Sequence, residues 1–460
     1  MEFWGSSAFW TSLSILGLLF AVELLASLIP SVRRLGVPLA ILAGVLGLLG
    51  SQQVLDLYEL DIPFLESSVY HGLGLLFIAL SLRTPAAKRG SGRDLPALSI
   101  GFGIPMVQAA QAFAALLVLL VVSSTWHPGL AMLVPMGFEQ GPGQALSMGA
   151  AWEKMGLENG GQLGLICAAL GYGWAVVVGV PLALVGRKRG WLASTQGEVG
   201  ASVASVEQRA TTPGGLDHLS VQLALIALCY GLTYGLCTML ARALPADIAP
   251  VVWSVHFIFG AVIAMGLRAL IARFWGEEDS PIDDYLMVRI GGLVVDLVTC
   301  AALAAIQIAV LRAYWVPLLL LTSVGGLLTL LVALWFGSRS WVDAPFEHAL
   351  LWFGMSTGTL PTGLALLRIV DPELRTPAAN SAVLGAAMSI PLVAPLILVL
   401  VPMSVKAYQT DWPTKGWVML AVFGVYTLVL IIAWAKFGGL RLRRPLARMW
   451  APAPADESAP

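Results

Sequence analysis

Long apolar runs recur along the whole chain and constrain its fold more than any other feature. The chain has 460 residues, of which 58% are hydrophobic and only 12% are charged. A soluble protein carries about 25% charged residues, so a water-soluble globular enzyme is excluded. Lys and Arg (26) nearly balance Asp and Glu (27), whereas a nucleic-acid binder needs basic residues to neutralise phosphates. The sequence therefore predicts an all-α polytopic membrane protein in a lipid bilayer, with no nucleic-acid partner.

Eleven apolar segments are predicted to span the membrane, because a helix rises about 1.5 Å per residue and the hydrocarbon core is about 30 Å thick. They are Phe9–Ile29, Val37–Leu49, Val69–Ser81, Leu95–Val122, Leu163–Val185, Leu219–Leu240, Val251–Leu270, Leu286–Ala309, Val316–Phe336, Ser381–Val401 and Trp417–Trp434. Two further stretches, 130–152 and 346–370, are broken by Gly and Pro. Each is predicted to be a re-entrant hairpin.

The distribution of basic residues supports this topology. If each segment crosses once and both hairpins return to the side they left, 21 of the 26 Lys and Arg residues fall on one side. The other side receives only Lys154, Arg242, Arg312, Lys406 and Lys415. Basic loops stay in the cytoplasm. We therefore expect a multi-pass protein of the cell membrane with its N-terminus outside and a cytoplasmic tail, 437–460.

A polar stretch, 187–217, divides the spans into two halves of the same order. Residues 1–186 and 218–405 each contain five predicted spans, with a hairpin between the fourth and the fifth. Five is odd, so the second half enters the membrane inverted relative to the first. The stretch 187–217 is predicted to be a cytoplasmic linker, and 416–436 an extra C-terminal transmembrane helix. An inverted repeat with matching interruptions is typical of secondary transporters.

Small and polar residues gather at both predicted hairpin tips. Glycine lets a backbone approach a ligand closely, freed amides and helix N-termini suit anionic groups, and freed carbonyls and hydroxyls suit Na⁺. The structural alternative is close helix packing by small residues. The predicted substrate-binding residues are Gly141, Gly143, Gln144, Ser356, Thr357, Gly358, Thr359 and Thr362.

Ion coupling is predicted for Asp296, Glu139 and Ser147, with Na⁺ bound at the hairpin tips and no organic cofactor. Asp296 lies inside an apolar run, where a carboxylate costs about 2.5–3.5 kcal/mol unless it is paired or hydrated. Glu139 and Ser147 belong to the first hairpin. The alternatives are that Asp296 is hydrogen-bonded within the bundle and that Glu139 lies in an outer vestibule.

The remaining reactive residues argue against enzymatic chemistry. The four cysteines lie in apolar runs without metal-ligand spacing, and the five histidines are scattered. The sequence contains no GxSxG or HExxH motif. Aspartyl chemistry needs two facing carboxylates, and only Asp296 is deep enough. His256 is expected to be a packed, neutral side chain, so we predict that the protein is not an enzyme.

Two stretches resemble the sodium/glutamate symporter family (glutamate:Na⁺ symporter, ESS family). They are Gly141-x-Gly143 ahead of Ala150-Ala151-Trp152, and Gly358-Thr359-Leu360-Pro361-Thr362. The resemblance covers roughly residues 10–401. It implies Na⁺-coupled symport of glutamate or a related carboxylate-bearing solute, with solute and ion between the hairpin tips, and a homodimer.

The chain also departs from that family. Pro142 and Gln144 stand where family members carry His and Thr, and 390–401 lacks the polar residues of the family's last repeat helix. These departures leave open an alternative function, a cation/proton antiporter that uses Asp296 without an organic substrate. A receptor or purely structural role is a further alternative.

Overall fold

The computed structural model describes residues 5–30, 32, 36–83, 95–193, 216–244, 249–276, 280–441 and 450. The described residues form helices and no strands, apart from one isolated bridge between Ser51 and Tyr58. Eleven of the described helical segments are long and apolar enough to cross a membrane. The predicted polytopic helical class is therefore confirmed. Most of the predicted linker 187–217 and tail 437–460 lies outside the described residues.

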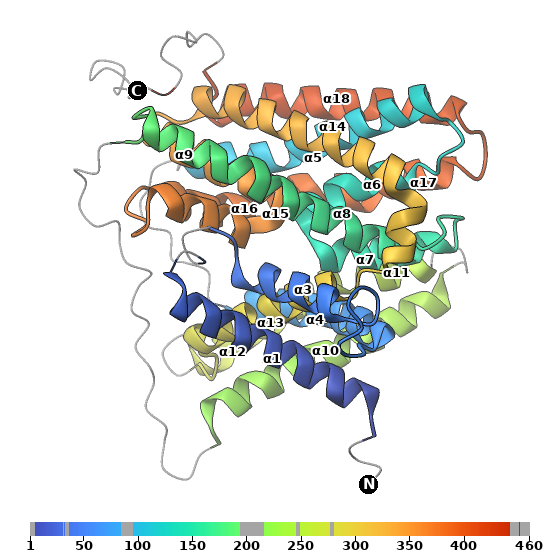
Figure 1. Ribbon diagram of the computed structural model, residues 1–460, viewed down its shortest axis with the longest axis vertical. Coiled ribbons are helices and arrows are strands. Elements are labelled where there is room, and N and C mark those ends of the chain that lie inside the picture. Colours follow the sequence, from blue (N-terminus) through green and yellow to red (C-terminus); the bar gives the residue numbers. More distant parts are fainter. Residues whose placement is uncertain are drawn as a thin grey trace.

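The helices follow one another as labelled in Figure 1. In chain order they are α1 (Ser7–Leu28), α3 (Leu39–Gly50), α4 (Ile62–Leu82), α5 (Leu95–Val122), α6 (Gly129–Pro135), η2 (Met136–Gln140), α7 (Pro142–Glu153), α8 (Gly160–Trp174), η3 (Ala175–Gly179), α9 (Val180–Lys188), α10 (His218–Ala243), α11 (Ala249–Ser254), α12 (His256–Trp275), α13 (Asp284–Ala304), α14 (Ile308–Ser340), α15 (Pro345–Val370), α16 (Ala378–Pro395), η4 (Leu396–Leu400), α17 (Val401–Ala407) and α18 (Thr414–Phe437).

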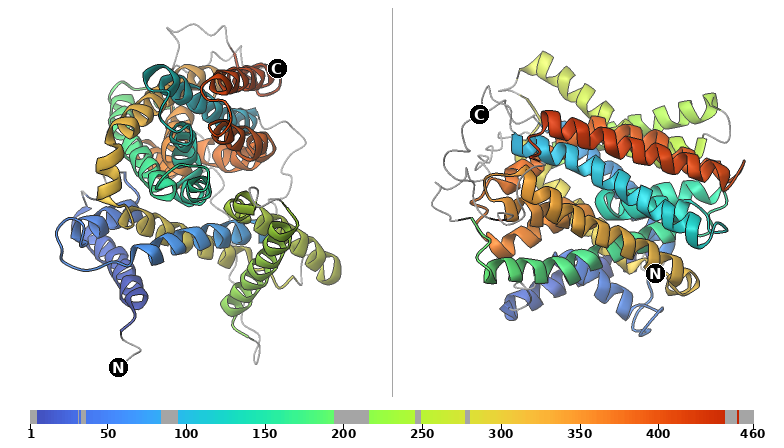
Figure 2. Two further views of the ribbon diagram at one scale, coloured as in Figure 1. Left: turned by 90° about the vertical axis from the view of Figure 1, so that its right-hand side faces the viewer. Right: turned by 90° about the horizontal axis from the view of Figure 1, so that it is seen from above.

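These helices form two bundles that lie one above the other (Figures 1 and 2). We call the upper one the hairpin bundle; it comprises α5 to α9 and α14 to α18. The lower one, the flanking bundle, comprises α1, α3, α4 and α10 to α13. Each half of the chain therefore contributes first to the flanking bundle and then to the hairpin bundle.

Corresponding helices of the two halves make corresponding contacts. In the flanking bundle α1 packs on α3, as α10 packs on α12. Helix α3 packs on α13, as α12 packs on α4, and α4 packs directly on α13. In the hairpin bundle α5 and α14 pack on each other, and the additional helix α18 packs on α5. Apart from the contact of the additional helix α18, exchanging the two halves leaves these helix pairs unchanged.

Several predicted spans differ from the observed helices. The one predicted at 286–309 runs past the end of α13 at Ala304 and through a non-helical break into α14. The segment predicted at 37–49 is α3, which has 12 residues and is shorter than a spanning helix. The one predicted at 69–81 lengthens to the 21 residues of α4, because Asp61 caps its N-terminus. The one predicted at 251–270 is interrupted at Val255, between α11 and α12. The freed carbonyl of Trp253 accepts a hydrogen bond from the Tyr70 hydroxyl at 2.7 Å.

Side-chain amides hold the short connection between α13 and α14. The amide of Gln162 on α8 donates to Ala305 O at 3.0 Å and to Glu66 Oε1 on α4 at 2.5 Å. Gln53, which follows α3, donates to Ile306 O at 2.8 Å. These bonds connect the two bundles at the point where the chain passes from one to the other.

Asp61 links α1 to the start of α4. Its carboxylate accepts hydrogen bonds from the Ser7 hydroxyl at 2.6 Å and from the Phe64 amide at 3.0 Å. The Ser7 hydroxyl first, and then the Phe64 amide, hold the pKa of Asp61 below its usual value. A lowered folded-state pKa stabilises the fold above the unfolded pKa, and this stabilisation is lost as the pH falls through the folded value.

Asp61→Asn is therefore expected to lower the Tm at pH 7 and to lower it less at pH 3, because the wild-type stabilisation is lost as the pH falls through the lowered folded-state pKa of Asp61. Thermal unfolding of the detergent-purified protein at both pH values measures this. Asp56→Asn, in the exposed loop before α4, is the matched control and should leave the Tm unchanged. An equal Tm for Asp61→Asn and wild type at pH 7 would refute the link.

Candidate functional site

The backbone of α15 folds back on itself at Gly358 and Thr359, which have non-helical dihedral angles. A Cβ placed on Gly354 would lie 2.7 Å from Cα of Gly363. In a straight helix these two residues would be about 13.5 Å apart. The second Gly- and Pro-broken stretch is therefore a helical hairpin whose two arms pack against each other.

The first broken stretch also folds back. Its arms are α6 with η2 and α7, separated by Gly141. His127 precedes the first arm and Met155 follows the second. His127 Nε2 lies 3.2 Å from Met155 O, so the two ends of this stretch are close together. Helix α7 packs closely on α8, where a Cβ on Gly149 would lie 2.1 Å from Gly160 O. Small residues permit this approach.

The two hairpin tips meet and share one unusual backbone conformation. A Cβ placed on Gly141 would lie 2.7 Å from Thr359 Cγ2. Gly141 has φ 87° and ψ −178°, and Thr359 has φ 70° and ψ 170°. This region is populated almost only by glycine, and such strain persists where the surrounding structure imposes it, often at functional sites. The two interruptions therefore lie side by side.

Polar side chains from α5 reach the tips. Gln111 Nε2 donates to the Ser356 carbonyl at 3.0 Å and to Thr329 Oγ1 on α14 at 2.7 Å. Gln140, directly before Gly141, donates to Gln108 Oε1 at 3.0 Å. Helix α5 therefore supplies two amide groups, one to each tip.

Several oxygen atoms at the tips are enclosed but lack a hydrogen bond. The Ser356 hydroxyl lies near the Glu139 carboxyl, yet Ser356 Oγ and Glu139 Oε2 form no hydrogen bond with the described residues. The same is true of Gln111 Oε1 and of Gln144 Oε1, one turn into α7. Enclosed acceptors without donors suit a bound cation or a solute that carries donors.

Tyr172 connects the second tip to the flanking bundle. Its hydroxyl lies beside the hydroxyls of Thr359 and of Thr299 on α13, and its ring lies 2.9 Å from where Gly358 would carry a Cβ. Asp296 is one turn before Thr299, and residues three apart share a helix face. The exposed Asp296 side chain therefore lies on the face of α13 turned toward Tyr172, without a contact to either tip among the described residues.

The other predicted site residues have structural partners. The Ser147 hydroxyl donates to the Ser254 carbonyl at 2.8 Å, where α7 meets α11, so it lies away from the tip contact. The Thr357 hydroxyl donates to Phe353 O within its own helix at 2.8 Å. Gly143 faces Leu73 on α4. Thr362 is buried and packs beside Gly358 in the second hairpin.

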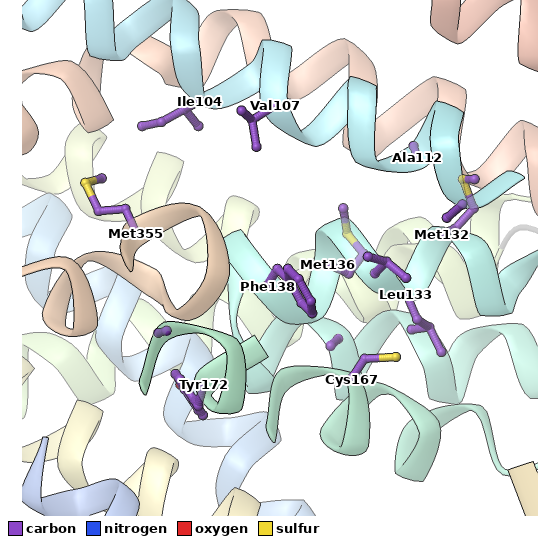
Figure 3. Close-up of a cluster of buried hydrophobic side chains, with 14 of the residues drawn as sticks. Ile104, Val107, Ala112, Met132, Leu133, Met136, Phe138, Cys167, Tyr172 and Met355 are labelled. Carbon is purple, nitrogen blue, oxygen red and sulfur yellow. The ribbon is translucent and has the colours of Figure 1, made fainter. Parts of the chain in front are cut away.

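Apolar side chains enclose the tips. Figure 3 shows Phe138 and Met136 of η2, Tyr172 and Cys167 of α8, and Met355 of α15 around the same region, with Ile104 and Val107 of α5 facing them. Phe138 and Met136 are fully buried. An apolar environment has a low dielectric constant, which strengthens the electrostatic interactions of the few polar atoms at the tips.

Sequence reasoning missed three of the groups at the tips: Gln108, Gln111 and Tyr172. Their signal was present, because two glutamines three residues apart are rare in an apolar span such as 95–122, and Tyr172 stands between two glycines. Among the described residues no group of three or more His, Cys, Asp or Glu side chains is placed to hold a metal ion.

Thr359→Gly is expected to stabilise the fold. Thr359 adopts a conformation that costs a non-glycine residue about 1–3 kcal/mol, and glycine gives back about 0.5–1 kcal/mol in chain entropy. The expected net gain is about 1 kcal/mol in the free energy of unfolding, measured by denaturant unfolding in detergent. Thr357→Gly, at a helical position, is the control and should destabilise. A loss of stability in Thr359→Gly would show that its strain is not real.

A comparison of the chain with protein-family models and with curated protein sequences finds no match.

Proposed function

We propose that this protein is a secondary active transporter that couples Na⁺ to the movement of glutamate or a related carboxylate-bearing solute across the cell membrane. The observation that carries the proposal is the contact between Gly141 and Thr359, two breaks with the same backbone conformation inside an apolar body. Interrupted helices that meet between two repeats form the binding sites of many such transporters.

The proposal includes an inverted repeat with two re-entrant hairpins. Helices at corresponding places in the two halves make corresponding contacts in the flanking bundle, which supports the repeat. The two arms of each hairpin fold back on each other, which supports hairpins that enter and leave the membrane on one side. Backbone that leaves the helix at membrane depth is tolerated where protein buries it or where it lines a hydrated cavity. The non-helical backbone at Gly141 and Thr359 would likewise have to be buried by protein or line a hydrated cavity.

An anionic group of the solute would bind the helix N-termini at the tips. Helix α7 starts at Pro142, and the second arm starts after Thr359. The first N–H groups of a helix have no partner within that helix and carry partial positive charge. Both starts lie at the junction of the tips, so two sets of free N–H groups would converge on one carboxylate.

The coupling ion would bind the enclosed oxygen atoms. Glu139, Gln111 and Ser356 provide carboxylate, amide and hydroxyl oxygens around one point of contact. Hard cations prefer such oxygen ligands. Asp296, one helical turn from Thr299, would contribute to ion coupling from α13 of the flanking bundle. Alternating access would move one bundle against the other.

Uptake of labelled glutamate and other amino acids into proteoliposomes tests the proposal. We expect accumulation that needs an inward Na⁺ gradient and disappears with K⁺ on both sides. Absence of Na⁺-dependent uptake of any carboxylate-bearing solute would contradict symport. Na⁺-driven proton movement without solute, abolished in Asp296→Asn, would instead establish the antiporter function, which the exposed Asp296 in the middle of α13 favours.

A further inference from the structure

A cavity of about 650 Å³ lies between the two bundles. One wall is α3, including Ile41 and Val45, and the other is the continuous helix formed by α8, η3 and α9, including Leu170 and Val177. Leu303 closes it on the side of α13. The lining is almost entirely aliphatic, and its size falls in the range of about 300–1,000 Å³ that is usual for ligand sites.

Water is a poor occupant of this cavity. A buried water needs two to four polar partners, and cavities lined by aliphatic side chains stay dry and take up apolar molecules. The cavity also lies apart from the polar groups at the hairpin tips, except for Tyr172, whose hydroxyl contacts Thr359. A polar solute would gain nothing along this lining. The occupant is therefore apolar.

The cavity is continuous with the outer apolar surface of the protein. Val45 and Val177 line it and are nevertheless 41% and 72% exposed. In a chain whose helices are mostly long and apolar enough to cross a membrane, exposed apolar side chains along such a helix face lipid. Acyl chains are the apolar molecules present at that surface.

The length of the cavity suits one acyl chain. Its wall on α8 to α9 runs from Ile166 to Pro181, which is about 22 Å at 1.5 Å per residue. One leaflet of a hydrocarbon core is about 15 Å thick. A single chain from one leaflet would therefore cover about two thirds of the wall.

Basic side chains continue the same helix face beyond the cavity. Val177, Val180 and Pro181 line it, and residues three or four apart share a face. That face continues through the exposed Leu184 to Arg187 and Lys188 at the C-terminus of α9. Lys and Arg just beyond a span attract anionic lipid headgroups, at about 1 kcal/mol per residue.

We propose that this cavity binds a membrane phospholipid, with one acyl chain between α3 and α8–α9 and its phosphate near Arg187 and Lys188. The lipid fills a space between the two bundles that no side chain occupies. This proposal depends on the membrane location of the chain and not on the transported solute.

Gly173→Leu tests the proposal, because Gly173 lines the cavity and a Cβ there meets no atom within 4 Å. The new side chain would fill the space that the acyl chain needs. Native mass spectrometry of the full-length protein, purified in mild detergent, counts retained phospholipids. We expect one in wild type and none in Gly173→Leu.

Gly235→Leu is the matched control. Gly235 is also an exposed helical glycine, on α10 and outside the cavity, and a Cβ there also meets no atom within 4 Å. It should retain one phospholipid. Retention by Gly173→Leu, or no retained phospholipid in wild type, would overturn the proposal.

Added lipid tests the headgroup part separately. Dioleoyl phosphatidylglycerol should raise the Tm of delipidated wild type by mass action and should leave the Tm of Gly173→Leu unchanged. Arg187→Gln should reduce the preference for phosphatidylglycerol over phosphatidylcholine about fivefold, the equivalent of about 1 kcal/mol. An unchanged preference would overturn the position assigned to the phosphate.

Discussion

Gly141→Ala is expected to abolish Na⁺-dependent uptake. Its φ of 87° and ψ of −178° belong to a region that costs a residue with a Cβ about 1–3 kcal/mol. The same Cβ would lie 2.7 Å from Thr359 Cγ2, so the two tips would have to separate. Uptake into proteoliposomes should fall at least tenfold, and thermal unfolding should show a lower Tm.

Two further variants make this result specific. Gly17→Ala, in α1, adds a methyl group where no atom lies within 4 Å and should keep full uptake with a slightly higher Tm, since alanine favours helices. Combining Gly141→Ala with Thr359→Gly removes the contacted methyl group and should restore part of the stability. Wild-type uptake in Gly141→Ala would show that the tips do not need to touch.

Glu139→Gln is expected to raise the Na⁺ concentration for half-maximal uptake at least tenfold. The amide has nearly the size of the carboxyl group, but it removes the negative charge from a site with enclosed oxygens of Gln111 and Ser356. A tenfold change corresponds to about 1.4 kcal/mol of Na⁺ binding free energy. The loss of a charged partner from a buried site commonly costs more than this.

The control for this change is Glu158→Gln, an exposed residue after α7, whose Na⁺ dependence should match that of wild type. Titration of uptake against Na⁺ at saturating solute separates the two variants. An unaltered Na⁺ dependence in Glu139→Gln would remove Glu139 from the ion site and would leave Asp296 as the coupling carboxylate.

The hairpins and their tips could be predicted because their signals are local. Gly141, Pro142, Gly358 and Pro361 interrupt apolar runs, and such residues end helices wherever they occur. The fold class followed from composition and run length.

Other parts depend on residues that are distant in sequence. The break at Val255 has no Gly or Pro beside it; its freed carbonyls are satisfied by Tyr70 of α4 and Ser147 of α7. Likewise, hydropathy does not tell which side of α5 faces the tips, so Gln111 could not be assigned. The rotation of α13 that turns Asp296 toward Tyr172 is fixed only by packing.

Cross-linking of the two tips in native membranes tests most directly whether the interruptions meet. In a variant without the four native cysteines, Gln140→Cys paired with Thr359→Cys should be joined in high yield by a short bis-methanethiosulfonate reagent. The control pairs Gln140→Cys with Thr376→Cys, beyond the far end of the second arm, and should stay unlinked. Equal yields for the two pairs would contradict the contact between the tips.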